Sequence, residues 1–214
     1  AGGVALPIAC DLRDEQQIEA AINTIRTHYS AIHGLINNAS AISLTDTVHT
    51  AAKRFDLMFD INVRGTFLLT QHCMPLLQAA KQAHIITMSP PINMDINWLS
   101  PHIAYTMAKY NMTMMAMAWA KEWESYGIHS NALWPATTIA TAAVQNLLGG
   151  DTLMQRSRLP AIVADAVLQL LNAPHHQYNG LQLLDETLLR DAGITDFSKY
   201  AFQEGMPLQV DLFL

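Results

Sequence analysis

The chain has few cysteines, no long apolar run and no excess of basic residues. Its two cysteines, Cys10 and Cys73, are far apart and sit among apolar neighbours, which is typical of buried thiols in a reducing compartment rather than of a disulfide. No apolar run approaches the roughly 20 residues that span a bilayer, and the first residues lack the order of a secretory signal. The 214 residues carry a net charge of -6, so nucleic acid is not expected as a partner. These absences favour a cytoplasmic protein without a membrane span that acts on a small molecule.

Metal-ligand spacing is absent as well. Nine histidines are present, but none forms a pattern such as HExxH, so no metal site is expected. His175 and His176 are interpreted as a polar turn.

Short apolar runs alternate with longer helical patterns along the chain. Five runs are predicted as strands: 4–10 (VALPIAC), 32–37 (IHGLIN), 84–88 (HIITM), 128–134 (IHSNALW) and 181–184 (LQLL). Four segments are predicted as helical: 14–29, 50–80 with bends near Gly65 and Pro75, a helix after the irregular segment 90–101, and 160–173. Strands separated by helices predict an α/β fold with a parallel sheet covered on both faces. The chain 1–214 is expected to be a single domain whose last residues, 186–214, form a mostly irregular tail.

A tyrosine and a lysine stand four residues apart in the helix after residue 101. Tyr105 and Lys109 therefore share one helix face, where a phenol and an ammonium can form an acid–base pair. The plain alternative is an amphipathic helix with a surface lysine. In parallel sheets ligands bind beyond the carboxyl ends of the strands. The residues that follow these strands are Asp11, 37–40, 89–90 and 134–138, and most of them are small or polar.

Five motifs together resemble a known family. NNAS, INVRG, MSPP, YTMAK and NALWP occur in the order and rough spacing of the short-chain dehydrogenase/reductase family. The segments NNASAISLTDT, SPPIN, ALWPATTIATAA, LLGG and GMPLQVDLFL are similar to its hydroxysteroid dehydrogenase-like subfamily, without a sterol-carrier domain. The resemblance covers essentially the whole chain. It implies a Rossmann-type doubly wound sheet and an oxidoreductase that moves a hydride between NADP(H) or NAD(H) and a carbonyl or alcohol.

The resemblance also implies catalytic residues. Tyr105 would be the general acid or base, and Lys109 would lower its pKa and bind the nicotinamide ribose; reaching neutrality requires a shift of about three units. Asn62 would hold a water that relays protons to the lysine. Ser89 would polarise the carbonyl, but it lies sixteen residues before Tyr105, more than is usual in the family. Ser100 or a water could serve instead, or Ser89 could simply end its strand.

Further positions would contact the cofactor. The resemblance assigns this role to Asp11, Asn38, Ala39, Ser40, Pro135, Ile139 and Thr141, together with the tyrosine and the lysine. Asp11 would accept a hydrogen bond from the adenine, although it could equally cap the helix that follows. Ala136 stands where the family usually has glycine. NADP is favoured over NAD on the subfamily resemblance alone.

One expected motif is missing. Neither Gly2-Gly3 nor Gly149-Gly150 lies in the strand, turn and helix setting of a phosphate-binding glycine turn. The first strand, that turn and the second strand are therefore expected upstream of Ala1, so the domain is interpreted as N-terminally incomplete, either in this chain or in the protein itself. Organellar targeting is left open for the same reason.

The sequence gives less direct evidence about the substrate and the partners. A set of apolar side chains near the tyrosine favours an apolar or lipid-like substrate or, equally, simple packing of a loop: Ile92, Met94, Ile96, Trp98, Leu99 and Trp134. The family resemblance implies a homo-oligomer formed through the Tyr105 helix, so Met112, Met115, Trp119 and Trp123 are interpreted as core or dimer contacts rather than as a ligand groove. The displaced serine and the missing turn leave an alternative open, a catalytically impaired nucleotide-binding or interaction protein of the same fold.

Overall fold

A computed structural model describes residues 2–174 and 177–214, so the turn predicted at His175 and His176 lies outside the described residues. Within them, four parallel strands form one sheet in the order β1-β2-β3-β4: β1 Gly34–Asn37, β2 Ala83–Met88, β3 Ile128–Trp134 and β4 Gln182–Leu184. The register places Asn37 beside Thr87 and Met88 beside Leu133. The carboxyl ends of β1, β2 and β3 therefore lie along one edge of the sheet.

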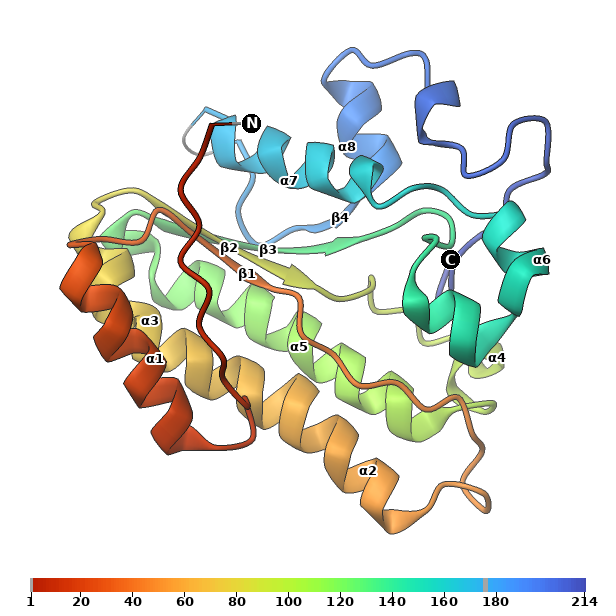
Figure 1. Ribbon diagram of the computed structural model, residues 1–214, viewed down its shortest axis with the longest axis horizontal. Helices are drawn as coiled ribbons and strands as arrows, with labels where there is room; N and C mark the ends of the chain where they lie inside the picture. Colours follow the sequence, from red (N-terminus) through yellow and green to blue (C-terminus); the bar gives the residue numbers. More distant parts are fainter. Residues whose placement is uncertain (1, 175–176) are drawn as a thin grey trace.

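Helices cover both faces of this sheet (Figure 1). One layer holds α1 (Glu15–His28), α3 (Thr66–Ala79) and α5 (Ile103–Glu122), and the other holds α7 (Ala161–Asn172) and α8 (Asp185–Asp191). Successive side chains of a strand point to opposite faces, so Ile85 is buried in the first layer and Ile86 in the second. The predicted doubly wound α/β fold of Rossmann type is confirmed.

Shorter helical segments complete the chain: α2 Ala52–Met58, η1 Phe59–Gly65, α4 Ile96–Leu99, η2 Glu124–Tyr126, η3 Val144–Leu148, α6 Gly150–Gln155 and η4 Ser198–Tyr200. The helical stretch predicted over 50–80 is thus α2, η1 and α3, and the bend expected near Gly65 is a π-helical turn. Pro75 lies inside α3. A side chain at Gly65 would come within 2.9–3.1 Å of Leu12 and of the Asp60 carbonyl, so glycine allows the N-terminal segment to pack closely on this turn.

The prediction of a strand at 4–10 is wrong. This segment is an extended and largely exposed chain, seen in red in Figure 1. A strand requires a hydrogen-bonded neighbour, and none of the described strands pairs with these residues. The other four predicted strands are present with shifts of at most two residues at their ends.

The C-terminal tail contains more structure than its sequence suggests. Its first residues form most of α8, which has acidic residues in its first turn and Arg190 in its last. The remainder returns to the end of β3, where Val210 forms an antiparallel bridge with Thr137. Phe213 is then buried in a cluster with Tyr105 and Trp134. The tail therefore packs inward, against the end of the sheet where ligands are expected.

Candidate active site

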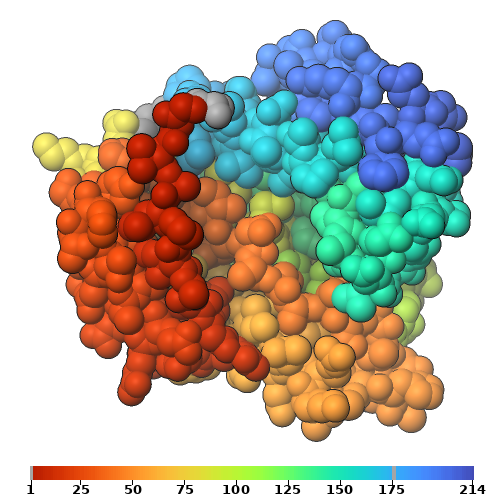
Figure 2. All heavy atoms as spheres, viewed as in Figure 1, coloured from red at the N-terminus to blue at the C-terminus, as the bar shows by residue number. Residues whose placement is uncertain are grey.

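A cavity of about 510 Å³ opens at the carboxyl ends of β1, β2 and β3, which is within the range of roughly 300–1,000 Å³ for small-molecule sites. Figure 2 shows this face hollowed between the red N-terminal segment and the teal segment around η3 and α6. The lining residues come from five regions of the chain: Ile36, Asn38, Ser40, Ile42, Met88, Tyr105, Lys109, Trp134, Pro135, Ile139, Thr141, Ala143, Pro160, Val163, Ala164 and Val167. Most are apolar. The position is the one at which parallel α/β sheets bind their ligands.

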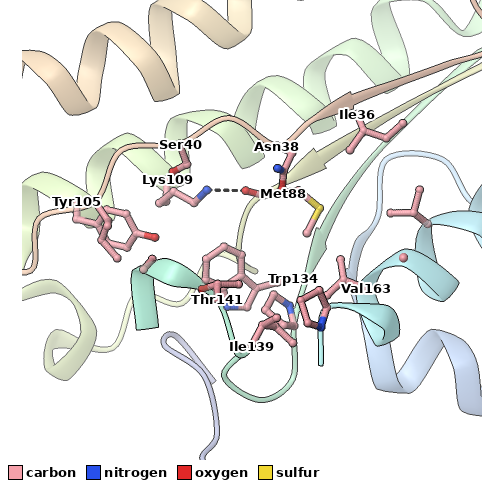
Figure 3. A pocket seen from close by; sticks show the side chains of 16 residues that line it. Ile36, Asn38, Ser40, Met88, Tyr105, Lys109, Trp134, Ile139, Thr141 and Val163 are labelled. Carbon is pink, nitrogen blue, oxygen red and sulfur yellow. Dashed lines mark hydrogen bonds between the residues drawn. The ribbon is translucent and has the colours of Figure 1, made fainter. Parts of the chain in front are cut away.

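Tyr105 and Lys109 both reach this cavity from α5, as their spacing predicted (Figure 3). The Lys109 ammonium donates a hydrogen bond to the Met88 carbonyl, at 2.5 Å, and lies 5.2 Å from the centre of the Trp134 ring. Burial lowers the pKa of Lys109 to about 7, and the nearby Asp211 carboxylate opposes this shift. A lysine that changes charge near neutral pH can take part in proton transfer.

The Tyr105 hydroxyl points into the same space and has no hydrogen-bond partner among the described residues. Its pKa is raised, first by burial and second by the Asp211 anion. The expected lowering of this pKa by Lys109 is therefore not seen. The physical reason is that the ring is only 4% exposed, so desolvation of the phenolate outweighs the field of a lysine that is itself partly discharged.

Asn62 lies in the π-helical turn η1 and is fully buried. Its amide oxygen accepts from the Ala41 N–H at 2.7 Å, and its amide nitrogen donates to the Ala41 carbonyl at 2.9 Å. The side chain thus holds the segment that follows β1. Turns of the π type often occur at functional positions because they redirect one side chain out of the helical pattern.

The segment after β1 brings two of its predicted residues to the cavity. Asn38 and Ser40 line it, and Ala39 lies in the turn between them. The preceding Asn37 is anchored by hydrogen bonds from its amide to the hydroxyls of Thr70 and Thr87. This segment is therefore fixed to both α3 and β2.

The loop after β3 supplies Pro135, Ile139 and Thr141, and all three line the cavity. The loop is tied at two points to distant parts of the chain. Ala140 donates its N–H to the Arg158 carbonyl at 2.8 Å, and Thr138 donates to the Gln209 carbonyl at 2.9 Å. The tail and the residues before α7 thus set the shape of this wall.

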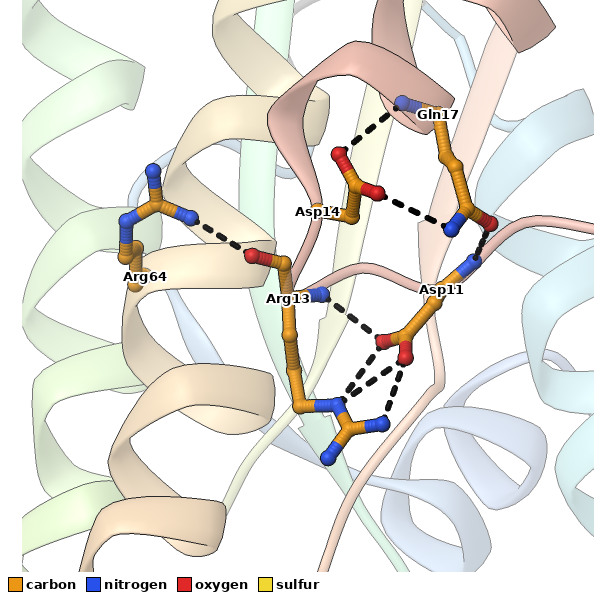
Figure 4. Close-up of polar contacts among 5 residues, drawn as sticks. All are labelled: Asp11, Arg13, Asp14, Gln17 and Arg64. Carbon is orange, nitrogen blue, oxygen red and sulfur yellow. Dashed lines mark hydrogen bonds and ion pairs between the residues drawn. The ribbon is translucent and has the colours of Figure 1, made fainter.

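Four predicted residues are not among those that line the cavity: Asn62, Ala39, Ser89 and Asp11. Ser89 is buried and is not among the residues that line the cavity; its hydroxyl is 3.5 Å from the Thr87 carbonyl oxygen. Asp11 is held by Arg13, whose side-chain and backbone hydrogen bonds lower its pKa to about 2 (Figure 4). The alternative that Asp11 caps the next helix is wrong, because Asp14 accepts the N–H groups of the first turn of α1.

Sequence reasoning missed two carboxylates near the site, Asp185 and Asp211. Asp185 is 1% exposed at the start of α8, and burial raises the pKa of Asp211 to about 6. The only sequence signal is a lone aspartate in the apolar ending VDLFL. No cluster of three potential metal ligands occurs among the described residues, and no helix within them could cross a membrane.

Comparison with known proteins agrees with this geometry. The family described as short chain dehydrogenase matches residues 1–150. The chain belongs to this family. It is 45% identical over 213 residues to hydroxysteroid dehydrogenase-like protein 2 of Homo sapiens. The aligned region covers all of this chain and 50% of the human protein. This short-chain dehydrogenase thus spans about half the length of the curated relatives it matches.

Two solved dehydrogenase structures superpose closely on this chain, and a third shares its fold. A putative dehydrogenase from Xanthomonas campestris is 41% identical in sequence and superposes with a TM-score of 0.94. The superposition covers 100% of this chain and 78% of that one. A short chain dehydrogenase of Mycobacterium thermoresistibile shares 47% with a TM-score of 0.92, covering 100% and 75%. A gluconate 5-dehydrogenase from Burkholderia cenocepacia, in complex with NADP and tartrate, shares 20% with a TM-score of 0.69, covering 81% and 71%. This last similarity concerns the fold alone.

The residues around the cavity are suited to the nicotinamide half of a dinucleotide. Tyr105 presents a hydroxyl without a partner among the described residues, and Lys109 has three N–H donors, of which the Met88 carbonyl takes one and the Met112 sulfur, at 3.5 Å, a second. Apolar residues such as Ile139 and Val163 could cover a flat ring. A glycine-rich phosphate turn is not found in the described part of the chain, so the fit is to this half of the cofactor.

Proposed function

We propose that this short-chain dehydrogenase is an oxidoreductase that transfers a hydride between NADP(H), or alternatively NAD(H), and a carbonyl or alcohol substrate. The observation that carries the proposal is the convergence of Tyr105 and Lys109 on one cavity at the carboxyl ends of the strands. The bound nicotinamide would supply or accept the hydride. NADP remains the favoured cofactor on the subfamily resemblance, and the NADP-bound dehydrogenase with the same fold is compatible with it.

The protein groups would handle the proton. In reduction, the Tyr105 hydroxyl donates its proton to the carbonyl oxygen and becomes a phenolate, and in oxidation the Tyr105 phenolate takes the alcohol proton. The Lys109 ammonium bonds the Met88 carbonyl and, at 3.5 Å, the Met112 sulfur, so its third N–H would be the one to donate to the ribose hydroxyls or the tyrosine oxygen. Asn62 would act through the segment after β1, with a water linking that segment to Lys109.

The substrate pocket favours an apolar carbonyl or alcohol. The cavity walls include Ile42 and Trp134, which pack in one apolar cluster with Tyr105 and offer little to a charged substrate. Burying apolar substrate surface here would contribute about 25 cal/mol per Å². A lipid-like substrate is therefore the first class to assay.

Tyr105→Phe is the direct test. It removes the proton donor and leaves the ring packing, so we expect turnover to fall by about 10²–10⁴-fold while dinucleotide affinity changes little. Dinucleotide titration by nicotinamide fluorescence, followed by a panel of apolar ketones and alcohols, measures both quantities in the full-length protein. The matched control is Tyr126→Phe, because Tyr126 is exposed and distant from the cavity. Equal activity of Tyr105→Phe and the parent protein would refute the assignment.

A second function has one observation in its favour. Ser89 does not line the cavity, and its hydroxyl lies near the Thr87 carbonyl instead. A protein that binds a dinucleotide but lacks a carbonyl-polarising hydroxyl would be a regulatory or interaction protein of the same fold. Tight binding of NADPH or NADH with no oxidation of any alcohol in the panel would favour this alternative.

A further inference from the structure

The Lys109 ammonium is buried without a carboxylate in contact. The residue is 2% exposed, and no ion pair found among the described residues includes it. Burying a charge costs free energy unless polar groups around it replace the lost water. Neutral groups that touch the ammonium must therefore provide much of that compensation.

Three neutral groups contact this ammonium. The Met88 carbonyl accepts a hydrogen bond at 2.5 Å and the Met112 sulfur accepts one at 3.5 Å, but a thioether is a weak acceptor. The third group is the Trp134 ring, whose centre lies 5.2 Å from the ammonium nitrogen. The face of an indole carries negative potential and attracts a cation within about 6 Å. Trp134 therefore compensates the charge together with the Met88 carbonyl.

The end of the chain holds the Trp134 ring in this place. The indole N–H donates to the Leu212 carbonyl at 3.1 Å. The Phe213 ring, itself 1% exposed, packs edge-on against the indole, with ring centres 6.1 Å apart and planes inclined by 65°. A hydrogen bond at the edge of the ring and an aromatic contact together restrict the rotation of the indole, so its face stays turned toward Lys109.

Trp134 is also part of the cavity wall. It is the last residue of β3 and lines the cavity with Tyr105 and Lys109, and Figure 3 shows its indole below the lysine. The titratable groups around the lysine are Tyr105, one turn earlier on α5, and Asp211 in the tail, whose field favours the ammonium. The strands β2 and β3 turn a carbonyl and the indole toward the ammonium.

We propose that Trp134 is a positioning residue for Lys109: its indole face holds the ammonium in the cavity, and Leu212 and Phe213 hold the indole. The catalytic meaning of this contact rests on the proposed function, because it concerns the same lysine, but the contact itself does not depend on turnover. Weakening the negative face of the ring destabilises the ammonium relative to the neutral amine, even when the shape of the side chain is kept. A residue that only fills space does not respond in that way.

Fluorinated tryptophan in place of Trp134 is the first test, because fluorine withdraws electron density from the ring face while adding little volume. Mono-, di- and trifluorotryptophan are placed at this position alone in the full-length protein. A carbon-13 NMR titration follows the Lys109 Cε signal, which is assigned by its loss in Lys109→Arg. The Lys109 midpoint should fall stepwise with each fluorine, by on the order of one pH unit in total. Equal midpoints across the series would overturn the proposal.

The matched control is the same series at Trp123, which stacks on Trp119 about four helical turns beyond Lys109. It should leave the Lys109 midpoint unchanged, and a shift as large as that at Trp134 would also overturn the proposal. Trp134→Leu removes the ring face and should lower the midpoint further than Met112→Leu, which removes only the weak sulfur contact. The reverse order would show that the sulfur holds the ammonium and would refute the role of the indole.

Phe213→Leu tests the hold of the tail on the indole. The variant keeps an apolar side chain but removes the ring that packs edge-on against Trp134. The Lys109 midpoint should fall toward that of Trp134→Leu, because the indole face is no longer fixed. An unchanged midpoint would refute the assignment of the orientation of the indole to the end of the chain.

Activity provides a separate readout. If the protein oxidises an alcohol, the limb of the pH–rate profile that reports the charged lysine should move to lower pH in the fluorinated proteins, by the same amount as the NMR midpoint. A purely structural role for Trp134 would change the rate without moving this limb, and that result would refute positioning. If the parent protein turns over no substrate, the proposed function fails, while the NMR titration still decides whether the indole holds the ammonium.

Discussion

Lys109 is 2% exposed, and this burial makes the stability of the fold depend on pH. Its pKa is about 7 in the folded chain, against 10.5 for the unperturbed side chain. Between these values the unfolded chain binds more protons than the folded one, so the free energy of unfolding rises as pH increases through this window. Below pH about 7 the folded chain must carry a buried Lys109 charge, so the stability gained at higher pH is absent there.

Lys109→Met should flatten this pH dependence. The variant keeps a similar apolar stem and has no proton to lose, so the rise in stability from pH about 7 to about 10 should be smaller than in the parent protein. Urea unfolding at several pH values measures the slope. Lys53→Met, at an exposed lysine, should keep the parent slope. An equal slope in Lys109→Met would show that the ammonium is hydrated rather than buried.

At the scale of elements, the π-helical turn η1 depends on close packing at Gly65. Alanine there would gain about 1 kcal/mol of helix propensity, but its Cβ would meet the Leu12 and Asp60 carbonyl oxygens at 3.0 and 3.1 Å. Backbone atoms cannot move aside cheaply, and overpacking costs about 1–3 kcal/mol. The cost of the clash should therefore exceed the gain in helix propensity, so Gly65→Ala should lower the free energy of unfolding.

Denaturant unfolding of Gly65→Ala measures this cost. The matched control is Gly3→Ala, because a side chain there would meet nothing within 4 Å. The clash should also displace Asn62, which lies in the same turn and holds Ala41. A Gly65→Ala protein as stable as the control would mean that the N-terminal segment does not pack on η1.

At the scale of the whole molecule, α5 has a buried face and an exposed apolar one. Met112 and Trp119 are buried in the core, which favours the core reading of these residues. Met107, Met114 and Met117 are exposed instead, and their spacing puts them along one side of the helix. We expect this stripe to form the contact of a homo-oligomer.

Sedimentation velocity of the full-length protein tests the contact. Met114, which is 58% exposed, would be changed to Asp, and a charge buried in an apolar interface should shift the protein to a smaller species. Met94→Asp alters another exposed methionine, on the segment before α4, and should leave the assembly unchanged. An identical distribution for both variants would place the interface elsewhere or exclude it.

Local patterns predicted the elements whose own residues determine their structure. β2, β3 and α5 appear where the periodicity placed them, because a continuous apolar run or a repeating apolar face favours one structure locally. The segment 4–10 shows the limit of this reasoning. Its pattern is that of a strand, but without a neighbouring ladder the residues stay extended and exposed.

The sequence by itself determined the layered parallel fold and the Tyr105–Lys109 pair, because helix spacing places residues four apart on one face. Only the tertiary structure decided what surrounds that pair. It buried both side chains, left Ser89 outside the cavity lining and packed Phe213, from the end of the chain, beside Tyr105. Burial and long-range charge arise from segments that are distant in sequence, and no local pattern encodes them.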